Sequence, residues 1–329
     1  MDEFRVRRYG VGNRDEWDRF VDVSRNATFL FKRDYMDYHS DRFQDCSWMA
    51  YKGGRLIALL PSNLTVESTL ISHQGLTYGG WILPQAHLDG SDLLEIFRIA
   101  ISEWRKLGIK KLIYKPLPFF YAERPSQEDL YALFRLGVNI KETNLSMTID
   151  LRSPGTYNKL RQRKLARTKD LMSEIEEMDD PEEMMNLVSA CLAERHDTVP
   201  VHTVSEMRLL KSRFPENIRF FGIREKYTPR PGESVGSGEK KQLAAAVCVY
   251  DTGLVAHAQY IATSTEGRAG DYLTPLFTNL IMEEFKNHRY FDFGISNEAH
   301  GLVLNSGLLR QKASFGATGT AVYAFEVAI

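Results

Sequence analysis

The residue types that could support catalysis gather near the end of the sequence, between Arg289 and Gly316. Asp292 interrupts a run of aromatic and apolar residues, and an aspartate inside a strand needs polar partners unless its pKa is raised. It is either a general base or a structural carboxylate, and Glu298, in a polar context, is the competing base. Lys312 could stabilise negative charge on a transferred acyl group, or it could only complement the dipole at a helix end.

A strand, a polar loop and a helix are predicted to position these residues. Residues 290–295 have the composition of a strand, residues 296–298 form a polar turn, and residues 304–316 show a helical pattern that ends at a glycine. In open α/β sheets, ligands bind at the carboxyl ends of strands. We therefore expect Ser296 and Asn297 to contact the acyl donor.

Three segments, taken in order, resemble the Fem-type acyltransferases, which are tandem-domain members of the GNAT superfamily. They are SHQGLTYGG at residues 72–80, a basic helix around Arg161, and FDFGIS followed by LNSGLLRQKASFG near the C-terminal end. The last segment departs from the family pattern at Gln311, where an aromatic residue often precedes the lysine. The resemblance covers most of the chain.

This resemblance implies an α/β (α+β) fold of two tandem GNAT-like domains, each a mixed, largely antiparallel sheet flanked by helices. It implies that the donor lies in the second domain and the acceptor in the cleft between the domains. Transfer would proceed without a covalent enzyme intermediate, through positioning and stabilisation of a tetrahedral oxyanion. Lys312 would correspond to the lysine of the family's C-terminal motif.

The length of 329 residues favours two domains. We predict residues 1–150 as an N-terminal, acceptor-side domain and residues 151–329 as a C-terminal, donor-side domain. Residues 225–241, rich in Gly, Pro, Ser and charge, are predicted to form a disordered hairpin tip. Three residues of one predicted helix recur at a constant spacing in another, and the order of elements around them also matches: Phe97, Ile101 and Glu103 correspond to Phe277, Ile281 and Glu283.

Composition limits the classes of function. The net charge of -1 gives no overall basic bias, so anion binding must come from local patches. Cys46, Cys191 and Cys248 form no close pair and show no metal-ligand spacing, which favours reduced thiols and predicts no metal site. The N-terminal residues lack an apolar signal core, and no apolar run approaches the ~20 residues of a membrane span. These features predict a soluble, cytoplasmic protein.

The loop at residues 266–270 is a candidate donor site, through Gly267, Arg268 and Gly270. In GNAT enzymes a glycine-rich loop at a helix N-terminus presents N–H groups to the pyrophosphate of coenzyme A. Asp271 follows immediately, and a carboxylate at a helix start repels a phosphate. We therefore expect weak or absent acetyl-coenzyme A binding. The alternative to a donor site is that the loop is an ordinary turn capped by Asp271.

A basic segment, residues 159–169, reads KLRQRKLARTK and is expected to be helical. Its arginines are candidate phosphate contacts, either to a tRNA backbone or to a nucleotide-linked acceptor. The alternative is a solvated basic face. The residues concerned are Arg161, Arg163 and Arg167.

The acceptor contacts are expected in the first domain, as the resemblance implies. Glycines within residues 72–80 suit a close backbone approach to a ligand, and aromatic residues near them suit a sugar or a base. His257, in an alternating strand, is predicted to be a core or groove histidine. The acceptor candidates are Lys32, Tyr38, His73 and Tyr78.

Together these features predict an acyltransferase that moves an acyl or aminoacyl group to an amine or hydroxyl of a cell-envelope or polysaccharide precursor. The acyl donor is either acetyl-coenzyme A or aminoacyl-tRNA, and no tightly bound cofactor is expected. Partners are a small-molecule or nucleotide-linked precursor and tRNA. Two alternatives stay open: an acetyl-coenzyme A-dependent N-acetyltransferase acting on a small molecule or sugar, and a non-catalytic binding protein on a decayed GNAT scaffold.

Overall fold

The computed structural model describes residues 3–85, 88–196, 198–225 and 242–329. The predicted hairpin tip, apart from Glu225, lies outside the described residues. By their internal contacts the residues form two compact units. Unit 1 comprises Met1–Leu145, Asn297–Leu304 and Ala321–Ile329, and unit 2 comprises Ser146–Ser296 and Asn305–Thr320.

Unit 1 contains a small antiparallel sheet and a second, mixed sheet. The small sheet has the order β1 (Phe4–Arg8), β3 (Trp48–Lys52), β4 (Arg55–Leu60). The mixed sheet has the order β2 (Gln44–Asp45), β5 (Asn63–Leu64), β6 (Thr69–Ile71), β7 (Lys111–Tyr114) and the later part of β16 (Thr318–Ala328). The helices are α1 (Arg14–Asp22), α2 (Arg33–Met36), α3 (Gly90–Lys106) and α4 (Glu128–Arg135), and β14 (Asn297–Glu298) pairs with β15 (Val303–Leu304).

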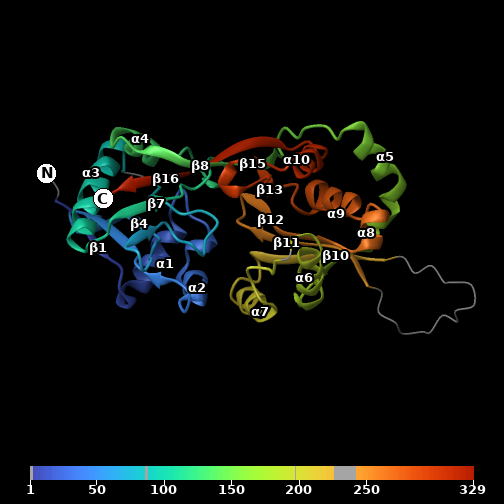
Figure 1. Cartoon of the computed structure of the whole chain (residues 1–329), viewed down its shortest axis with the longest axis horizontal. Coiled ribbons are helices and arrows are strands. Elements are labelled where there is room, and N and C mark those ends of the chain that lie inside the picture. Colours follow the sequence, from blue (N-terminus) through green and yellow to red (C-terminus); the bar gives the residue numbers. More distant parts are fainter. Residues whose placement is uncertain (1–2, 86–87, 197, 226–241) are drawn as a thin grey trace, which may run out of the picture. The chain divides into compact units, whose positions relative to one another are not determined.

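Unit 2 is built on one mixed sheet with helices on both faces. Its strand order is the end of β8 (Asn139–Asp150), β13 (Tyr290–Ile295), β12 (Val255–Thr263), β11 (Leu243–Asp251), β10 (Ile218–Arg224) and β9 (Ile175–Met178). Its helices are α5 (Lys159–Thr168), α6 (Glu182–His196), α7 (Val204–Arg213), α8 (Thr265–Ala269), α9 (Leu273–Asn279) and α10 (Ser306–Ala313). Helices α9 and α6 cover opposite faces of this sheet (Figure 1).

A parallel strand–helix–strand order recurs in the two units, as the internal repeat predicted. In unit 1, α3 connects the parallel strands β6 and β7, and in unit 2, α9 lies between the parallel strands β12 and β13. Phe97 on α3 and Phe277 on α9 are each buried in the hydrophobic core of their own unit. The predicted correspondence of these two residues therefore reflects equivalent places in the element order.

The return of the C-terminal residues to unit 1 differs from the predicted division into 1–150 and 151–329. β16 pairs antiparallel with β7, with Phe325 opposite Tyr114 and Val327 opposite Leu112. Phe325 and Val327 are buried in the unit 1 core. A domain boundary at a single sequence position cannot assign β16 to unit 1, because strand pairing brings together residues that are far apart in the chain.

Strand β8 is one long strand over Asn139–Asp150, and the end of β6 at Ile71 is followed by a loop. Among the helices of the described residues, none is both long and apolar enough to cross a membrane.

Candidate active site

Unit 2 contains a cavity of about 600 Å³ between α5, α9, α10 and one face of the sheet. This is a size typical of small-molecule sites. Part of the wall is apolar, including Phe277, Phe293 and Leu308. Five basic side chains also line it, while Asp271 is the acidic residue in the described lining. The basic residues are Arg161, Lys164, Arg268, Arg310 and Lys312.

Arg161 is a buried cation of this cavity whose hydrogen-bond partners are neutral. Nε and Nη2 donate to the Ser314 hydroxyl at 3.0 and 2.9 Å, and Nη1 donates to that of Thr274 at 2.6 Å. The guanidinium lies 3.9 Å from the ring centre of Phe315. Burial lowers the pKa of Arg161, and the more distant charge of Asp271 opposes this effect. The described residues contain no carboxylate in an ion pair with Arg161, so an anionic ligand would complete its environment.

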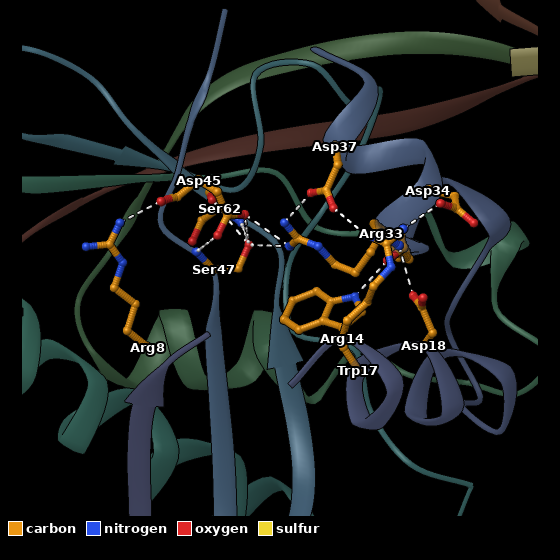
Figure 2. A network of polar contacts seen from close by, with 11 residues as sticks. Arg8, Arg14, Trp17, Asp18, Arg33, Asp34, Asp37, Asp45, Ser47 and Ser62 are labelled. Atoms are coloured by element: carbon orange, nitrogen blue, oxygen red, sulfur yellow. Dashed lines mark hydrogen bonds and ion pairs between the residues drawn. The ribbon is translucent and has the colours of Figure 1, made fainter. Parts of the chain in front are cut away.

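Arg33, in unit 1, shows the opposite arrangement (Figure 2). Its guanidinium is as deeply buried, but it pairs with the carboxylates of Asp37 at 2.5 Å and Asp45 at 3.1 Å. It also stacks on the Tyr9 ring at 4.1 Å. Because these carboxylates neutralise its charge, Arg33 has a structural role, and the contrast singles out Arg161 as the arginine suited to a ligand.

Lys312 also lines the cavity and is 5% exposed. Its Nζ donates to the backbone oxygens of Gly294 at 2.9 Å and Ile295 at 2.5 Å. Burial lowers its pKa to about 8, while the nearby Asp292 carboxylate favours the charged form. An ammonium group has three N–H donors, so one remains for a ligand after these two bonds.

Asp292 is buried and accepts hydrogen bonds from several donors. The donors include Ser146 Oγ at 2.7 Å, Thr148 Oγ1 at 3.1 Å, the Gly294 N–H at 3.1 Å and His257 Nδ1 at 2.8 Å. Burial by itself would raise the pKa of Asp292, but these donors, with His257 foremost, outweigh burial and keep the pKa below its usual value. A carboxylate that is ionised and fully engaged in this way is a poor direct base for an acceptor.

The strands β12 and β13 diverge next to this residue. They pair in parallel over Val255–His257 and Tyr290–Asp292, and beyond that point the two strands, both fully described, continue without pairing to each other. β12 also has a bulge that leaves Gln259 out of register with β11. A bulged residue is unpaired in its ladder, so its N–H can serve a ligand.

The predicted phosphate loop at residues 266–270 is instead the short helix α8. Its N–H groups are used within the chain: Gly267 N donates to Ser264 Oγ at 2.8 Å, Arg268 N to Ser264 O at 3.0 Å, and Gly270 N to Glu266 O at 2.8 Å. These three N–H groups are therefore engaged within the chain, and donor contact by Gly267, which lines the cavity, and by Gly270 stays a prediction.

Gly267 has a packing role. A Cβ at this position would lie 1.9 Å from the backbone oxygen of Ala244, so only glycine lets α8 approach β11. Arg268 does line the cavity, although its guanidinium also bonds Thr263 O and Glu194.

The basic helix α5 divides its charges between the cavity and the solvent. Arg161 and Lys164 line the cavity, whereas Arg163 is exposed and lies outside its lining. Arg167 is exposed and forms an ion pair with Asp271 at 3.6 Å, and Lys164 pairs with the same carboxylate. A turn capped by Asp271 was the alternative for this loop, and in the structure the Asp271 side chain is held by these cations.

The polar residues after β13 have separate environments. Ser296 is fully buried, and its backbone oxygen accepts from Asn305 N. Asn297, in unit 1, accepts from Leu145 N at 2.7 Å and donates to Asn144 at 2.6 Å, which leaves it little capacity for the predicted donor contact. Glu298 is exposed in unit 1.

Two of the predicted acceptor residues are core residues of unit 1. His73 is 2% exposed and stacks on His39 with ring centres 5.1 Å apart. Tyr78 is buried and donates to Thr28 Oγ1 at 3.2 Å. Both side chains are occupied by internal packing, which disfavours direct acceptor contact, and the predicted role stays a prediction.

The glycines near His73 make close approaches within the protein. A Cβ on Gly75 would lie 2.0 Å from His39 Nε2, and one on Gly79 would lie 2.1 Å from Ser72 O. The predicted close backbone approach exists, but its partner is the chain itself.

The other two predicted acceptor residues are half-buried at the surface of unit 1. Lys32 donates to Asp18 O at 3.0 Å and pairs with Asp22. Tyr38 packs against the rings of Tyr35 and His39. Both remain predictions for acceptor contact.

Sequence reasoning missed several residues of the site. His257 was predicted to be a core or groove histidine, and its contact with Asp292 was not foreseen. Thr274 and Ser314 supply the hydroxyls that hold Arg161, and nothing in the sequence marks them. Lys164 could have been found, since its spacing from Arg161 places both on one helix face.

Comparison with known structures identifies the fold. No protein-family model and no curated protein matches the sequence. The crystal structure of FemX matches with a TM-score of 0.67 at 10% identity, over 98% of this chain and 97% of that chain. The chain has a Fem-like tandem GNAT fold. This confirms the predicted α/β class and tandem architecture.

Two further structures agree with this fold. The C-terminal domain of a putative lysylphosphatidylglycerol synthetase from Agrobacterium fabrum has a TM-score of 0.56 at 12% identity, over 95% of this chain and 92% of that chain. A tandem GNAT protein from the clavulanic acid biosynthesis pathway has a TM-score of 0.51 at 14% identity, over 99% and 98%. At such identities the likeness concerns the fold, and function has to be argued from the site.

Proposed function

We propose that the protein transfers an acyl or aminoacyl group from a donor bound in the unit 2 cavity to an amine or hydroxyl of a cell-envelope or polysaccharide precursor. The observation that carries this proposal is Arg161, a buried cation held by neutral hydroxyls at a cavity with five basic side chains. Such a wall attracts a ligand with negative charge, and the apolar part of the wall suits an acyl chain.

The donor we favour is aminoacyl-tRNA. The N–H groups of Gly267, Arg268 and Gly270 are used internally, which weakens a pyrophosphate cradle for coenzyme A at that point. The exposed cations of α5, including Arg163, suit a polynucleotide backbone. Fold likeness to FemX and to the synthetase domain supports this class of reaction by analogy.

Acetyl-coenzyme A is the second candidate donor, with a small molecule or sugar as acceptor. The cavity volume and its combination of apolar and basic walls favour this option, because they suit a compact phosphate-bearing thioester. In either case the donor arrives and leaves with each turnover.

The chemistry we propose is direct attack of the acceptor on the donor carbonyl. The remaining N–H of Lys312 and the N–H of Gln259 in the β12 bulge would stabilise the oxyanion that forms. The acceptor, a nucleotide-linked or other small precursor, would bind through unit 1, with Lys32 and Tyr38 as contacts. We place the reaction in the cytoplasm, where charged tRNA and nucleotide-linked precursors are found together.

Calorimetry with acetyl-coenzyme A and with aminoacyl-tRNA tests the donor site. Arg161→Gln should weaken binding of either donor by about 10-fold or more, since about 1.4 kcal/mol corresponds to a factor of ten. Arg163→Gln, on the exposed side of α5, should leave acetyl-coenzyme A binding unchanged but reduce the salt dependence of tRNA binding. Binding of neither donor by the wild-type chain would favour the non-catalytic alternative.

A further inference from the structure

His257 and Asp292 form a histidine–carboxylate pair at the point where β12 and β13 diverge. The register of the two strands ends with His257 opposite Asp292. His257 Nδ1 lies 2.8 Å from Asp292 Oδ2. An ionised carboxylate can only accept a hydrogen bond, so Nδ1 carries the proton, and Nε2 of the neutral ring is left with a free lone pair.

The carboxylate is fixed by its own partners. Ser146, Thr148 and the Gly294 N–H all donate to Asp292 Oδ1, and the imidazole Nδ1 lies against Oδ2. These hydrogen bonds favour the ionised form of Asp292 in spite of its burial. An orienting carboxylate held in this way sets both the tautomer and the direction of the histidine ring.

The imidazole is partly exposed. The His257 side chain is 13% exposed, and within the described residues no group is bonded to Nε2. Gly294 contributes to this access, because a Cβ there would lie 3.3 Å from His257 Cε1. Its φ of +73° also favours glycine.

The pair lies on the sheet face opposite the cavity. Along β13, Phe291 and Phe293 point into the core under α9, and Phe293 lines the cavity, so Asp292 between them points to the other face. Along β12, Ala256 and Ala258 belong to the same core, so His257 points with Asp292. The donor would thus approach the point where β12 and β13 diverge from one face of the sheet. The base at His257 would approach the same point from the other face.

Within the part of the chain that the structure describes, three charged or titratable groups belong to positions next to His257 or Gly294. They are the Asp292 carboxylate on β13, the Tyr250 phenol on β11, whose Cα pairs with that of His257, and Lys312 on α10, which binds Gly294 O. The base His257 and the cation Lys312 therefore lie near the same point, where β12 and β13 diverge.

We propose that His257 is the general base of the transfer and that Asp292 is its positioning residue. This rests on the proposed function. Nε2 removes the proton from the acceptor amine or hydroxyl as its nitrogen or oxygen forms a bond to the donor carbonyl carbon. The tetrahedral intermediate then collapses, the carbonyl–oxygen or carbonyl–sulfur bond breaks, and the imidazolium returns the proton to the leaving hydroxyl or thiol.

Kinetics of the full-length protein provide the first test, with acetyl-coenzyme A or aminoacyl-tRNA as donor and a panel of precursor amines and hydroxyls as acceptors. His257→Gln should lower kcat by about 100-fold or more, leave KM for the donor unchanged, and remove the acidic limb of the pH–kcat profile. Asp292→Asn should lower kcat but keep part of the acidic limb of the pH–kcat profile. His288→Gln is the matched control, because His288 Nε2 forms a similar pair with Asp251 at 2.7 Å, and it should leave kcat unchanged.

Nitrogen-15 NMR of histidine-labelled protein provides the second test, and it needs no substrate. In the neutral ring we expect the proton of His257 on Nδ1 and not on Nε2, and we expect Asp292→Asn to abolish this preference. An active enzyme in which His257→Gln keeps kcat, or a wild-type ring with its proton on Nε2, would overturn the role of His257. A chain with the expected tautomer but no transfer from either donor would overturn the proposed function, and the base assignment with it.

Discussion

At the residue scale, Lys312 and Arg161 are cations placed where water is largely excluded. Lys312 is held by two backbone carbonyls, and Arg161 is held by two hydroxyls and an aromatic ring. Neither arrangement neutralises a charge as the carboxylates around Arg33 do. Both cations therefore favour a ligand or transition state that brings negative charge into the cavity.

We expect Lys312→Ala to lower kcat by about 100-fold or more while the protein still folds, because an oxyanion would lose a donor. The melting temperature should fall modestly, since the carbonyls of Gly294 and Ile295 lose their partner. Lys286→Ala, at an exposed lysine of the same unit, is the control for turnover. Unchanged kcat in Lys312→Ala would limit this lysine to a role in holding the end of β13.

The depressed pKa of Lys312, about 8, gives two pH-dependent expectations. The unfolded state holds the proton up to pH ~10.4, so between these values it binds more protons than the folded state. Stability relative to Lys312→Met should then rise with pH across this window, by up to roughly 3 kcal/mol. Turnover, which needs the charged form, should fall as the pH rises through about 8.

Urea unfolding of both proteins at several pH values measures the first expectation, and the difference between them cancels the contribution of Lys115, whose pKa is also lowered to about 8. A difference that is flat with pH would contradict the inferred environment of Lys312.

At the element scale, the connection from α8 to α9 controls the charge of the cavity. Asp271 is the acidic residue of the described lining, and its carboxylate is bound by Lys164 and Arg167. It has a φ of +58°, a conformation that asparagine also tolerates. Asp271 thus pairs with two cations, Lys164 and Arg167, that could otherwise bind a ligand.

We expect Asp271→Asn to raise the affinity for an anionic donor several-fold, because Lys164 becomes available and a repulsive charge is removed. Calorimetry with acetyl-coenzyme A at two salt concentrations measures this, and the gain should shrink at high salt. Asp170→Asn, on the exposed segment after α5, is the control. A loss of affinity in Asp271→Asn would mean that the ion pair shapes the cavity and does not compete with the ligand.

At the scale of the whole molecule, each unit is completed by residues from a distant part of the sequence. Unit 1 takes the end of β16, and unit 2 keeps α10 with Lys312. In unit 1 this strand covers the edge of β7 and buries Phe325 and Val327.

We expect a chain that ends at Thr320 to lose the folding of unit 1 first. Removing Phe325 and Val327 costs about 1.5–3 kcal/mol for each buried side chain and leaves β7 as an exposed edge. Hydrogen exchange should show lost protection in β6 and β7 while β11 and β12 of unit 2 stay protected. Deletion of Ile329 alone is the control, and full protection of β7 in the shorter chain would contradict the assignment of β16 to the unit 1 core.

The sequence by itself determined the elements and the fold class. Local sequence patterns predicted the helices that became α5 and α10 and the strand β13, because burial on one face of an element shows in the spacing of nearby residues. The repeat at Phe97 and Phe277 and the C-terminal motif led to the tandem fold that the solved structures confirm. Lys312 and Arg161 stood out because of their motifs.

Only the tertiary structure decided which of the candidate residues meet. The contact between His257 and Asp292 depends on the parallel register of β12 and β13, and that of Arg161 with Thr274 and Ser314 depends on how α5, α9 and α10 pack. The sequence does not show that the N–H groups of Gly267 and Gly270 form hydrogen bonds within the chain. Hydrogen bonding and burial are settled by groups distant in the chain, so one-dimensional spacing cannot tell a ligand contact from a satisfied structural residue.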